Sequence, residues 1–138
     1  MENLLLIALK EYGEKEIIGK QNNQTIVDYA GEAGFHWIND DETPWCSIFM
    51  NLIVQRRGWI PTNKANARSW LHWRHPIMSP ELGDIAVFKR GNSDWQGHVA
   101  LFIRADNELI YVLGGNQSNQ VKISAYKKSD LLGFRRYN

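Results

Sequence analysis

The fold of this chain is decided by one stretch, 43-TPWCSIFMNLIVQRRG-58, which contains the only cysteine among the 138 residues. Its pattern predicts a helix. Thr43 is a good N-cap, Pro44 suits the first helical position, and Gly58 lies just beyond the expected end. The buried face is formed by apolar residues at helical spacing, which are Ile48, Phe49, Leu52 and Ile53.

With Thr43 as the cap, Cys46 occupies the first turn of this helix. Its sulfur then lies among unpaired backbone N–H groups at the positive end of the helix dipole. Such groups stabilise a thiolate, so we expect the pKa of Cys46 to fall below the ordinary value of about 8.5. The alternative is a small buried hydrophobic residue, because Cys46 borders the apolar face. A nearby base decides between the two.

Helical patterns come first along the chain, and strand patterns follow them. Helices are expected at about residues 4–12, 23–33 and 66–74, in addition to the one that carries the cysteine. After Pro80 come five short runs bounded by Gly, Asp and Asn, as is typical of strands. They are GDIAVFKRG, GHVALFIRA, ELIYVLGGN, QVKISAY and GFRRY. Helices packed on an antiparallel sheet of about five strands predict one α+β domain over residues 1–138.

Four histidines are available as a base, and His98 is the best candidate because it follows Gly97 and opens the apolar run HVALFI. A residue at the mouth of a strand is held rigidly while its ring faces a cleft. The spacing of His72 and His75 suggests metal ligands. However, no HExxH glutamate or second Cys/His cluster accompanies them, so we expect no metal site. His36, ten residues before the cysteine, is expected to line the site.

A Cys–His pair usually needs a third polar group to orient the imidazole. A turn at residues 106–107 would join two strands of a hairpin. A two-residue turn places His98 opposite Gly115, and a three-residue turn places it opposite Asn116. Either register brings GGNQ beside His98, so Asn116 is the expected orienting residue and Gln117 the second choice. The alternative for Asn116 is a turn asparagine after two glycines.

Composition excludes several classes of protein. The chain has 16 basic and 15 acidic residues and a net charge of +1, which argues against a protein built to hold nucleic acid or anionic membrane. A single cysteine cannot form an internal disulfide. The start, MENLLLIALKEYG, has no small-residue cleavage site and is too short to span a bilayer. We therefore expect synthesis in a cytoplasm without a signal peptide, and delivery by other proteins if the chain acts elsewhere.

The motifs PWC, GDIAVF, GHVALF and LGGNQ together resemble the papain-like cysteine peptidases of bacterial cell walls. These are the NlpC-type and CHAP-type enzymes, in particular a small single-domain subgroup found in phage lysis cassettes and bacterial toxins. The resemblance covers about residues 41–137. It implies a papain-like fold with Cys46 as nucleophile, His98 as base and Asn116 as the third polar residue. It also implies hydrolysis of amide bonds in peptidoglycan, within the stem peptide or between peptide and sugar, without a metal or organic cofactor.

Further expectations follow from this resemblance. Trp45, Trp95, Gln117 and His36 are candidate substrate-binding residues. Trp70 and Trp73 are also candidates for the groove wall, and core packing is expected for at least two of the four tryptophans. The expected partner is peptidoglycan, with a delivery system or an immunity protein as further partners, and the site of action is the cell wall. Two alternatives stay open. They are an acyltransferase or deamidase that uses the same Cys–His pair, and a non-catalytic wall-binding module of the same fold.

Overall fold

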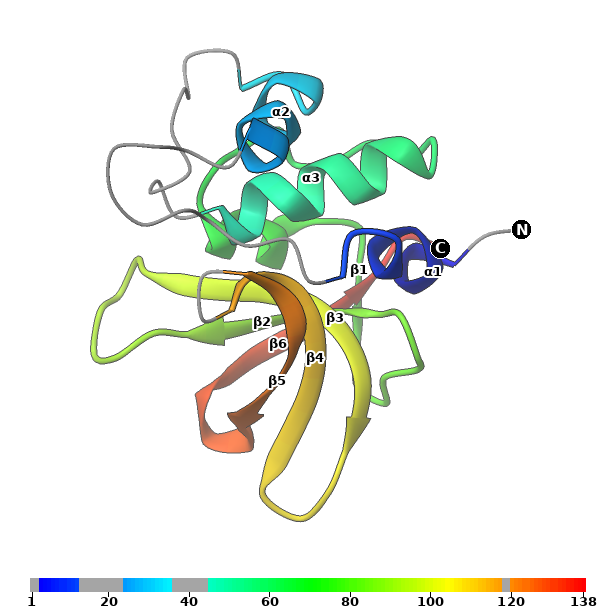
Figure 1. The fold of residues 1–138 in the computed structure, drawn as a ribbon. Coiled ribbons are helices and arrows are strands. Elements are labelled where there is room, and N and C mark those ends of the chain that lie inside the picture. Colours follow the sequence, from blue (N-terminus) through cyan, green and yellow to red (C-terminus); the bar gives the residue numbers. More distant parts are fainter. Residues whose placement is uncertain (1–2, 13–23, 36–44, 118–119) are drawn as a thin grey trace.

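The structure is a computed structural model that describes residues 3–12, 24–35, 45–117 and 120–138 (Figure 1). The helices are α1 (Leu4–Leu9), α2 (Gln24–Glu32) and α3 (Cys46–Arg56), with the short 3₁₀ helices η1 (Ala67–His72) and η2 (Lys128–Asp130). The strands are β1 (His75–Ile77), β2 (Ile85–Lys89), β3 (Gly97–Ala105), β4 (Leu109–Gln117), β5 (Gln120–Lys127) and β6 (Leu131–Arg136). Among these described residues, no helix has the length and apolar character needed to cross a membrane.

The strands form one antiparallel sheet in the order β1-β6-β2-β3-β4-β5, and Figure 1 shows the α-helices gathered at one side of this strongly curved sheet. The predicted α+β class is confirmed, as are the five predicted strands. The sequence did not reveal β1. It is only three residues long, contains Pro76, and pairs with β6 near the end of the chain. A strand this short has no periodicity of its own to detect.

The curved sheet buries apolar side chains on both of its faces. Residues of β2, β3 and β4 alternate between the two faces, as strand geometry requires. One face packs against α3 and contributes Val87, Val99 and Leu113 to the main core. The opposite face closes a second cluster that includes Phe88, Ala100, Phe102 and Val112. Because His98 neighbours Val99 in β3, its side chain belongs to this second face.

Helix α3 is the central element of the main core, and every residue from Cys46 to Val54 is buried. Burial all round the helix exceeds the single apolar stripe that the sequence predicted, because α1 and α2 cover the side that the sheet leaves open. The helix ends at Arg56, and Gly58 lies just beyond the end, as predicted, with a φ of +88°. The N–H of Gly58 donates to the Gln55 carbonyl, and the N–H of Trp59 donates to that of Val54. These two bonds form a Schellman motif.

The start of α3 differs from the prediction. The N-cap is Trp45, which makes no side-chain cap bond, so Cys46 is the first helical residue and not the third. The predicted cap, Thr43, and the predicted first helical residue, Pro44, lie outside the described residues. A sequence motif for capping therefore misplaced the helix start by two residues.

The turn of the β3–β4 hairpin also differs from the predicted one. Its turn is centred one residue later, at Asn107–Glu108, because the side chain of Asp106 accepts the N–H groups of Glu108 and Leu109 at 3.1 and 2.9 Å. The register shifts by one residue between Phe102 and Arg104, and beyond that bulge Leu101 pairs with Leu113. The Leu101–Leu113 pair has the offset of the predicted three-residue turn, and the described pairing of β3 with β4 ends at this pair.

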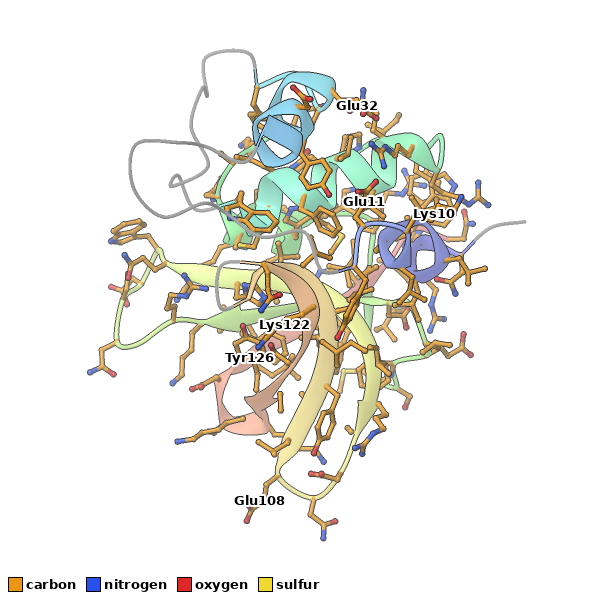
Figure 2. All side chains as sticks on the ribbon, in the orientation of Figure 1. Lys10, Glu11, Glu32, Glu108, Lys122 and Tyr126 are labelled. Atoms are coloured by element: carbon orange, nitrogen blue, oxygen red, sulfur yellow. The ribbon has the colours of Figure 1, made fainter. Side chains whose placement is uncertain are left out.

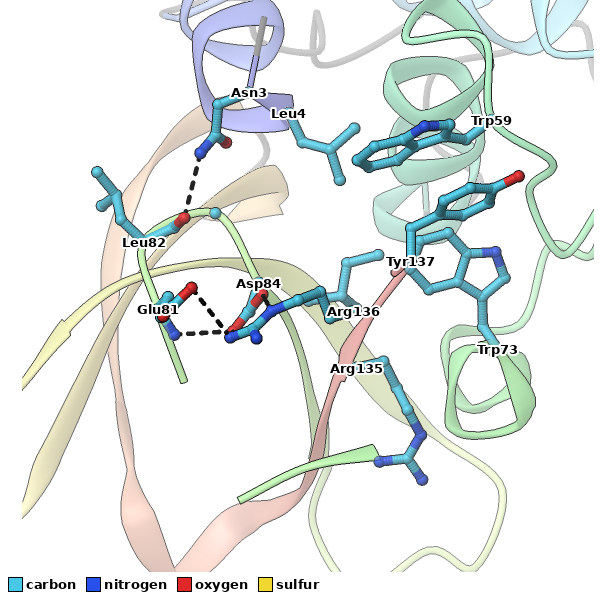
Figure 3. Close-up of a pocket in the computed structure, with 12 residues that line it drawn as sticks. Asn3, Leu4, Trp59, Trp73, Glu81, Leu82, Asp84, Arg135, Arg136 and Tyr137 are labelled. Carbon is cyan, nitrogen blue, oxygen red and sulfur yellow. Dashed lines mark hydrogen bonds and ion pairs between the residues drawn. The ribbon is translucent and has the colours of Figure 1, made fainter. Parts of the chain in front are cut away.

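The C-terminal strand is anchored to the loop before β2 by a partly buried ion pair (Figure 3). Asp84 is buried, and Arg136 donates to its two carboxylate oxygens at 2.8 and 2.6 Å. A buried carboxylate needs such pairing, since an unpaired charge there would be strongly destabilising. Trp59 stacks on Tyr137 in the same corner, with ring centroids 4.5 Å apart. These residues line a pocket, shown in Figure 3, and none of the predicted catalytic residues is part of its lining.

Gly115 on β4 permits the close packing of α3 on the sheet, and its replacement by alanine tests this. An added Cβ would lie 2.6 Å from Trp45 Cζ3 and 2.9 Å from Phe49 Cβ, so Gly115→Ala should lower the free energy of unfolding by about 1–3 kcal/mol. Gly31→Ala in α2 is the matched control, because its Cβ would meet nothing within 4 Å. That variant should be neutral or more stable by about 0.5–1 kcal/mol. Urea denaturation measures both, and equal effects would contradict this packing.

Candidate active site

The thiol of Cys46 lies against the beginning of β3. Backbone N–H groups of Val99, Ser47 and Cys46 itself donate toward the sulfur. The Val99 N–H is available because the described pairing of β3 with β4 ends at Leu101 and Leu113. The sulfur therefore lies beside Val99, the residue that follows His98 in β3.

The pKa of Cys46 contradicts the prediction from the sequence. Cys46 is only 5% exposed, and burial raises the pKa of its thiol. The N–H groups of Val99 and of the helix start, together with the charge of Arg90, act in the opposite direction but do not outweigh desolvation. The resting thiol is therefore protonated at neutral pH, and its activation requires a base.

His98 is 1% exposed, and its ring is held by contacts on the second face of the sheet. It stacks on Tyr126 of β5 with centroids 4.9 Å apart and an interplanar angle of 21°. Tyr126 stacks in the same way on Phe88, the β2 partner of His98. Nδ1 of His98 lies 3.5 Å from Nη2 of Arg90. Arginine has no acceptor, so Nδ1 takes the acceptor role in this contact. The ring orientation is thereby fixed before substrate binds.

Tyr126 and Arg90 are two residues of the site that the sequence analysis missed. Burial, the largest effect, raises the pKa of Tyr126 to about 12. The charge of Arg90 lowers it and the thiolate form of Cys46 raises it. Figure 2 labels Tyr126 on the sheet. No sequence pattern pointed to Tyr126, because only the register of β5 brings it to His98. Arg90 carried a weak signal, as a charged residue between a strand and a glycine.

A cavity of about 360 Å³ opens beside Cys46. One wall is formed by residues 65–67 at the start of η1, and the other by Arg90 and residues 95–97 of the β2–β3 loop. Trp95 is 72% exposed and lines this cavity, as the prediction of a substrate-binding wall requires. The cavity therefore offers one flat aromatic surface and one cation next to the thiol.

Two buried polar residues of α3 fix the first wall. Ser47 donates to the carbonyl of Lys64 at 2.7 Å, and Asn51 donates to the same carbonyl at 3.1 Å. The side-chain oxygen of Asn51 accepts the N–H of Asn63 at 2.7 Å. Buried groups that are satisfied in this way hold a loop rigidly. The segment leading to residues 65–67 is thus positioned by the same helix that begins with the cysteine.

The second wall is held by Arg68 of η1. Its guanidinium donates to the carbonyls of Gln96 and Ser93 at 2.8 and 2.7 Å. The hydroxyl of Ser93 accepts the N–H groups of Trp95 and Gln96 at 3.2 and 3.1 Å. The loop that carries Trp95 is therefore tied to the helix that forms the opposite wall.

Of the other predicted site residues, one is placed by the structure and three are not. Trp45 is buried at 2% exposure against Tyr29 and Phe49, so its position corrects the expectation that it faces substrate. Asn116 and Gln117 belong to β4, but their side chains lie outside the described part of the structure, as does the whole of His36. These three assignments stay predictions.

Two more candidate tryptophans and two histidines do not line the cavity beside Cys46. Trp70 and Trp73 are buried in the core, as expected for at least two of the four candidate tryptophans. His72 and His75 are exposed, and neither lines the cavity beside Cys46. Within the described ranges, no group of three or more His, Cys, Asp and Glu side chains is placed to hold a metal ion.

Comparison with known families gives one match. The family model of the CHAP domain matches residues 38–116, which is more than half of the 138-residue chain. The matched segment begins before Cys46, includes His98 and ends at Asn116. A search of curated proteins found no match.

The raised pKa of Cys46 makes the stability of the protein depend on pH. The folded state favours the protonated thiol, so this contribution is complete below the ordinary thiol pKa and is lost as pH rises toward the folded value. Between about pH 7 and about pH 10, the wild type should therefore lose more free energy of unfolding than Cys46→Ala. Urea denaturation at both pH values measures the difference. An equal loss in the two proteins would show that the thiol is not desolvated by folding.

Proposed function

Because this chain belongs to the CHAP domain family, we propose that it cleaves amide bonds of bacterial peptidoglycan with Cys46 as nucleophile and His98 as base. CHAP domains are in general cysteine- and histidine-dependent hydrolases of peptidoglycan, of the amidase or peptidase type. The observation that carries the residue assignment is that the Cys46 sulfur lies close enough to Val99 for its backbone N–H to lower the pKa of the thiol. This proximity places the only thiol of the chain at the start of the strand that contains His98.

The first chemical step follows from the protonated resting thiol. His98 accepts the proton of Cys46 as the sulfur attacks the carbonyl carbon of the amide. The carbonyl π electrons move to oxygen, and N–H groups at the start of α3 stabilise the resulting oxyanion. When the C–N bond breaks, protonated His98 gives its proton to the leaving amine, and a thioester remains on Cys46.

Water completes the reaction. His98 accepts a proton from water as its oxygen attacks the thioester carbonyl, and the C–S bond breaks to release a carboxylic acid. The proton on His98 then returns to the thiolate, which restores the resting state. The stacked Tyr126 supports both steps because it keeps the imidazole in one plane while the proton moves.

Two bonds fall within the proposal. They are an amide within the stem peptide, cut by an endopeptidase, and the bond between peptide and sugar, cut by an N-acetylmuramoyl-L-alanine amidase. The exposed ring of Trp95 beside the cavity suits a polymeric substrate of either kind. We further propose that the protein acts in the cell wall as a lysin or an antibacterial toxin that other proteins release or deliver.

Incubation with purified peptidoglycan followed by mass spectrometry of the fragments tests this function. New amino groups within stem peptides indicate an endopeptidase, and free lactyl-sugars with intact peptides indicate an amidase. Products in which an added amine replaces water would favour the acyltransferase alternative. Intact peptidoglycan after exposure to the folded protein would contradict the proposal.

Substitution of the two proposed catalytic residues should abolish hydrolysis equally. Cys46→Ala and His98→Ala each remove a member of one reacting unit, so their losses should be similar and not additive in the double variant. Hydrolysis rates are compared after circular dichroism has shown that each variant is folded. His72→Ala and His75→Ala are matched controls and should keep most activity, since both side chains are exposed and away from the cavity. Equal loss at His75 and His98, with zinc in the purified protein, would favour a metal site.

Asn116 is proposed to orient His98 through its side-chain oxygen, which would accept the ring N–H. Asn116→Ala should leave Cys46 and His98 competent but misaligned, and should lower turnover by about ten- to a thousand-fold. Gln117→Ala is the control, because neighbouring side chains of a strand point to opposite faces. Near-normal turnover in both variants would remove this end of β4 from the reaction.

A further inference from the structure

The cavity beside Cys46 carries a single charged side chain among the described residues that line it, that of Arg90. Its other walls are largely uncharged and apolar, with Ala65, Ala67, Trp95 and Gly97 among the residues that form them. Arg90 is itself exposed, and it is the one cation at the edge of this cavity that an anionic ligand of Cys46 would meet among the described residues.

The guanidinium of Arg90 is directed toward the reacting groups and not into bulk solvent alone. Nη2 lies 3.5 Å from Nδ1 of His98, and the charge of Arg90 lowers the pKa of both Cys46 and Tyr126. The guanidinium therefore lies beside His98, and Arg90 lines the same cavity as Cys46. The backbone behind it is fixed, because Lys89 and Gly97 are the last paired residues of β2 and β3.

Four other arginines have protein partners for their guanidinium donors. Arg56 pairs with Glu11 and Glu32, and Arg136 pairs with Asp84 and Glu81. Arg68 and Arg135 donate to backbone carbonyls. Within the described part of the chain, no carboxylate pairs with Arg90, so most of its five donors remain available in the cavity.

A guanidinium with free donors matches a carboxylate, which it binds through two parallel N–H···O bonds. We propose that Arg90 binds a free carboxylate of the substrate next to the scissile amide, so that the protein selects acidic stem peptides over their amidated forms. This inference rests on the proposed function for the identity of the substrate. Arg90 is thus a specificity residue, and the carboxylate that it binds would also neutralise the positive charge beside Nδ1 of His98.

Alkylation of Cys46 by two small reagents tests Arg90 without peptidoglycan. Iodoacetate and iodoacetamide both transfer a two-carbon group to the sulfur and release iodide, but only iodoacetate is an anion. Any change in the thiolate fraction affects both rates equally, so the ratio of the two rates isolates recognition of the carboxylate. In the wild type this ratio should exceed that of a free thiol, and Arg90→Ala should lower it by about ten-fold.

Two further variants make the alkylation test specific. Lys89→Ala removes the same charge from the adjacent, exposed position and should leave the ratio unchanged, because Lys89 does not line the cavity. Arg90→Lys keeps the charge but loses the two-pronged geometry, and should retain part of the preference. An equal ratio in wild type and Arg90→Ala would overturn the proposal. So would failure of both reagents to reach Cys46, since the cavity would then admit no carboxylate.

Kinetics on stem peptides complete the test. For peptides with free carboxylates, Arg90→Ala should raise KM by about ten-fold with a smaller change in kcat, and for amidated peptides KM should be unaffected. Equal KM changes for both peptides would overturn the assignment of Arg90. If the wild type prefers iodoacetate in an Arg90-dependent manner but cleaves no peptidoglycan, the proposed function fails while carboxylate binding by Arg90 stands.

Discussion

The contact between the first turn of α3 and the backbone of Gly115 is the constraint on which the site depends. Trp45 and Phe49 occupy the space that a side chain at this position would need, so the helix start approaches the sheet more closely than any larger residue permits. This approach places the Cys46 sulfur where the strand pairing of β3 and β4 has ended and Val99 N–H is open. One missing Cβ thus links the packing of the core to the position of the thiol.

Cys46 and His98 belong to different elements, α3 and β3, and packing holds each of them in place. Cys46 comes with a helix that is buried on all sides, whereas His98 is held by the stacked ring of Tyr126 on the opposite face of the sheet. The cavity walls are attached to the same elements through Ser47, Asn51 and Arg68. Groups that are positioned before substrate binds need no reorganisation during the reaction, which is a main source of catalytic rate.

The sequence predicted what local patterns determine. Apolar spacing identified α3 and five strands, and the Gly58 signal located the helix end, because these depend on neighbours along the chain. It was wrong about the pKa of Cys46, since the sign of the shift depends on how deeply the sheet buries the sulfur. It also missed Tyr126, which meets His98 through strand pairing across a long sequence separation, and Arg90, which lies near His98 because β2 and β3 pair up to Lys89 and Gly97. Leu101 and Leu113 pair with the offset predicted for a three-residue turn. They do so because a bulge between Phe102 and Arg104 compensates for a turn that lies one residue later than Asp106–Asn107.

The burial of Cys46 has a consequence for the durability of the protein. Peroxide and other oxidants react with thiolates that are accessible, and the product, a sulfenic acid, proceeds to irreversible forms. A sulfur that is 5% exposed and protonated at rest presents neither the charge nor the surface that this reaction needs. We therefore expect Cys46 to be oxidised more slowly than an exposed thiolate while no substrate is bound.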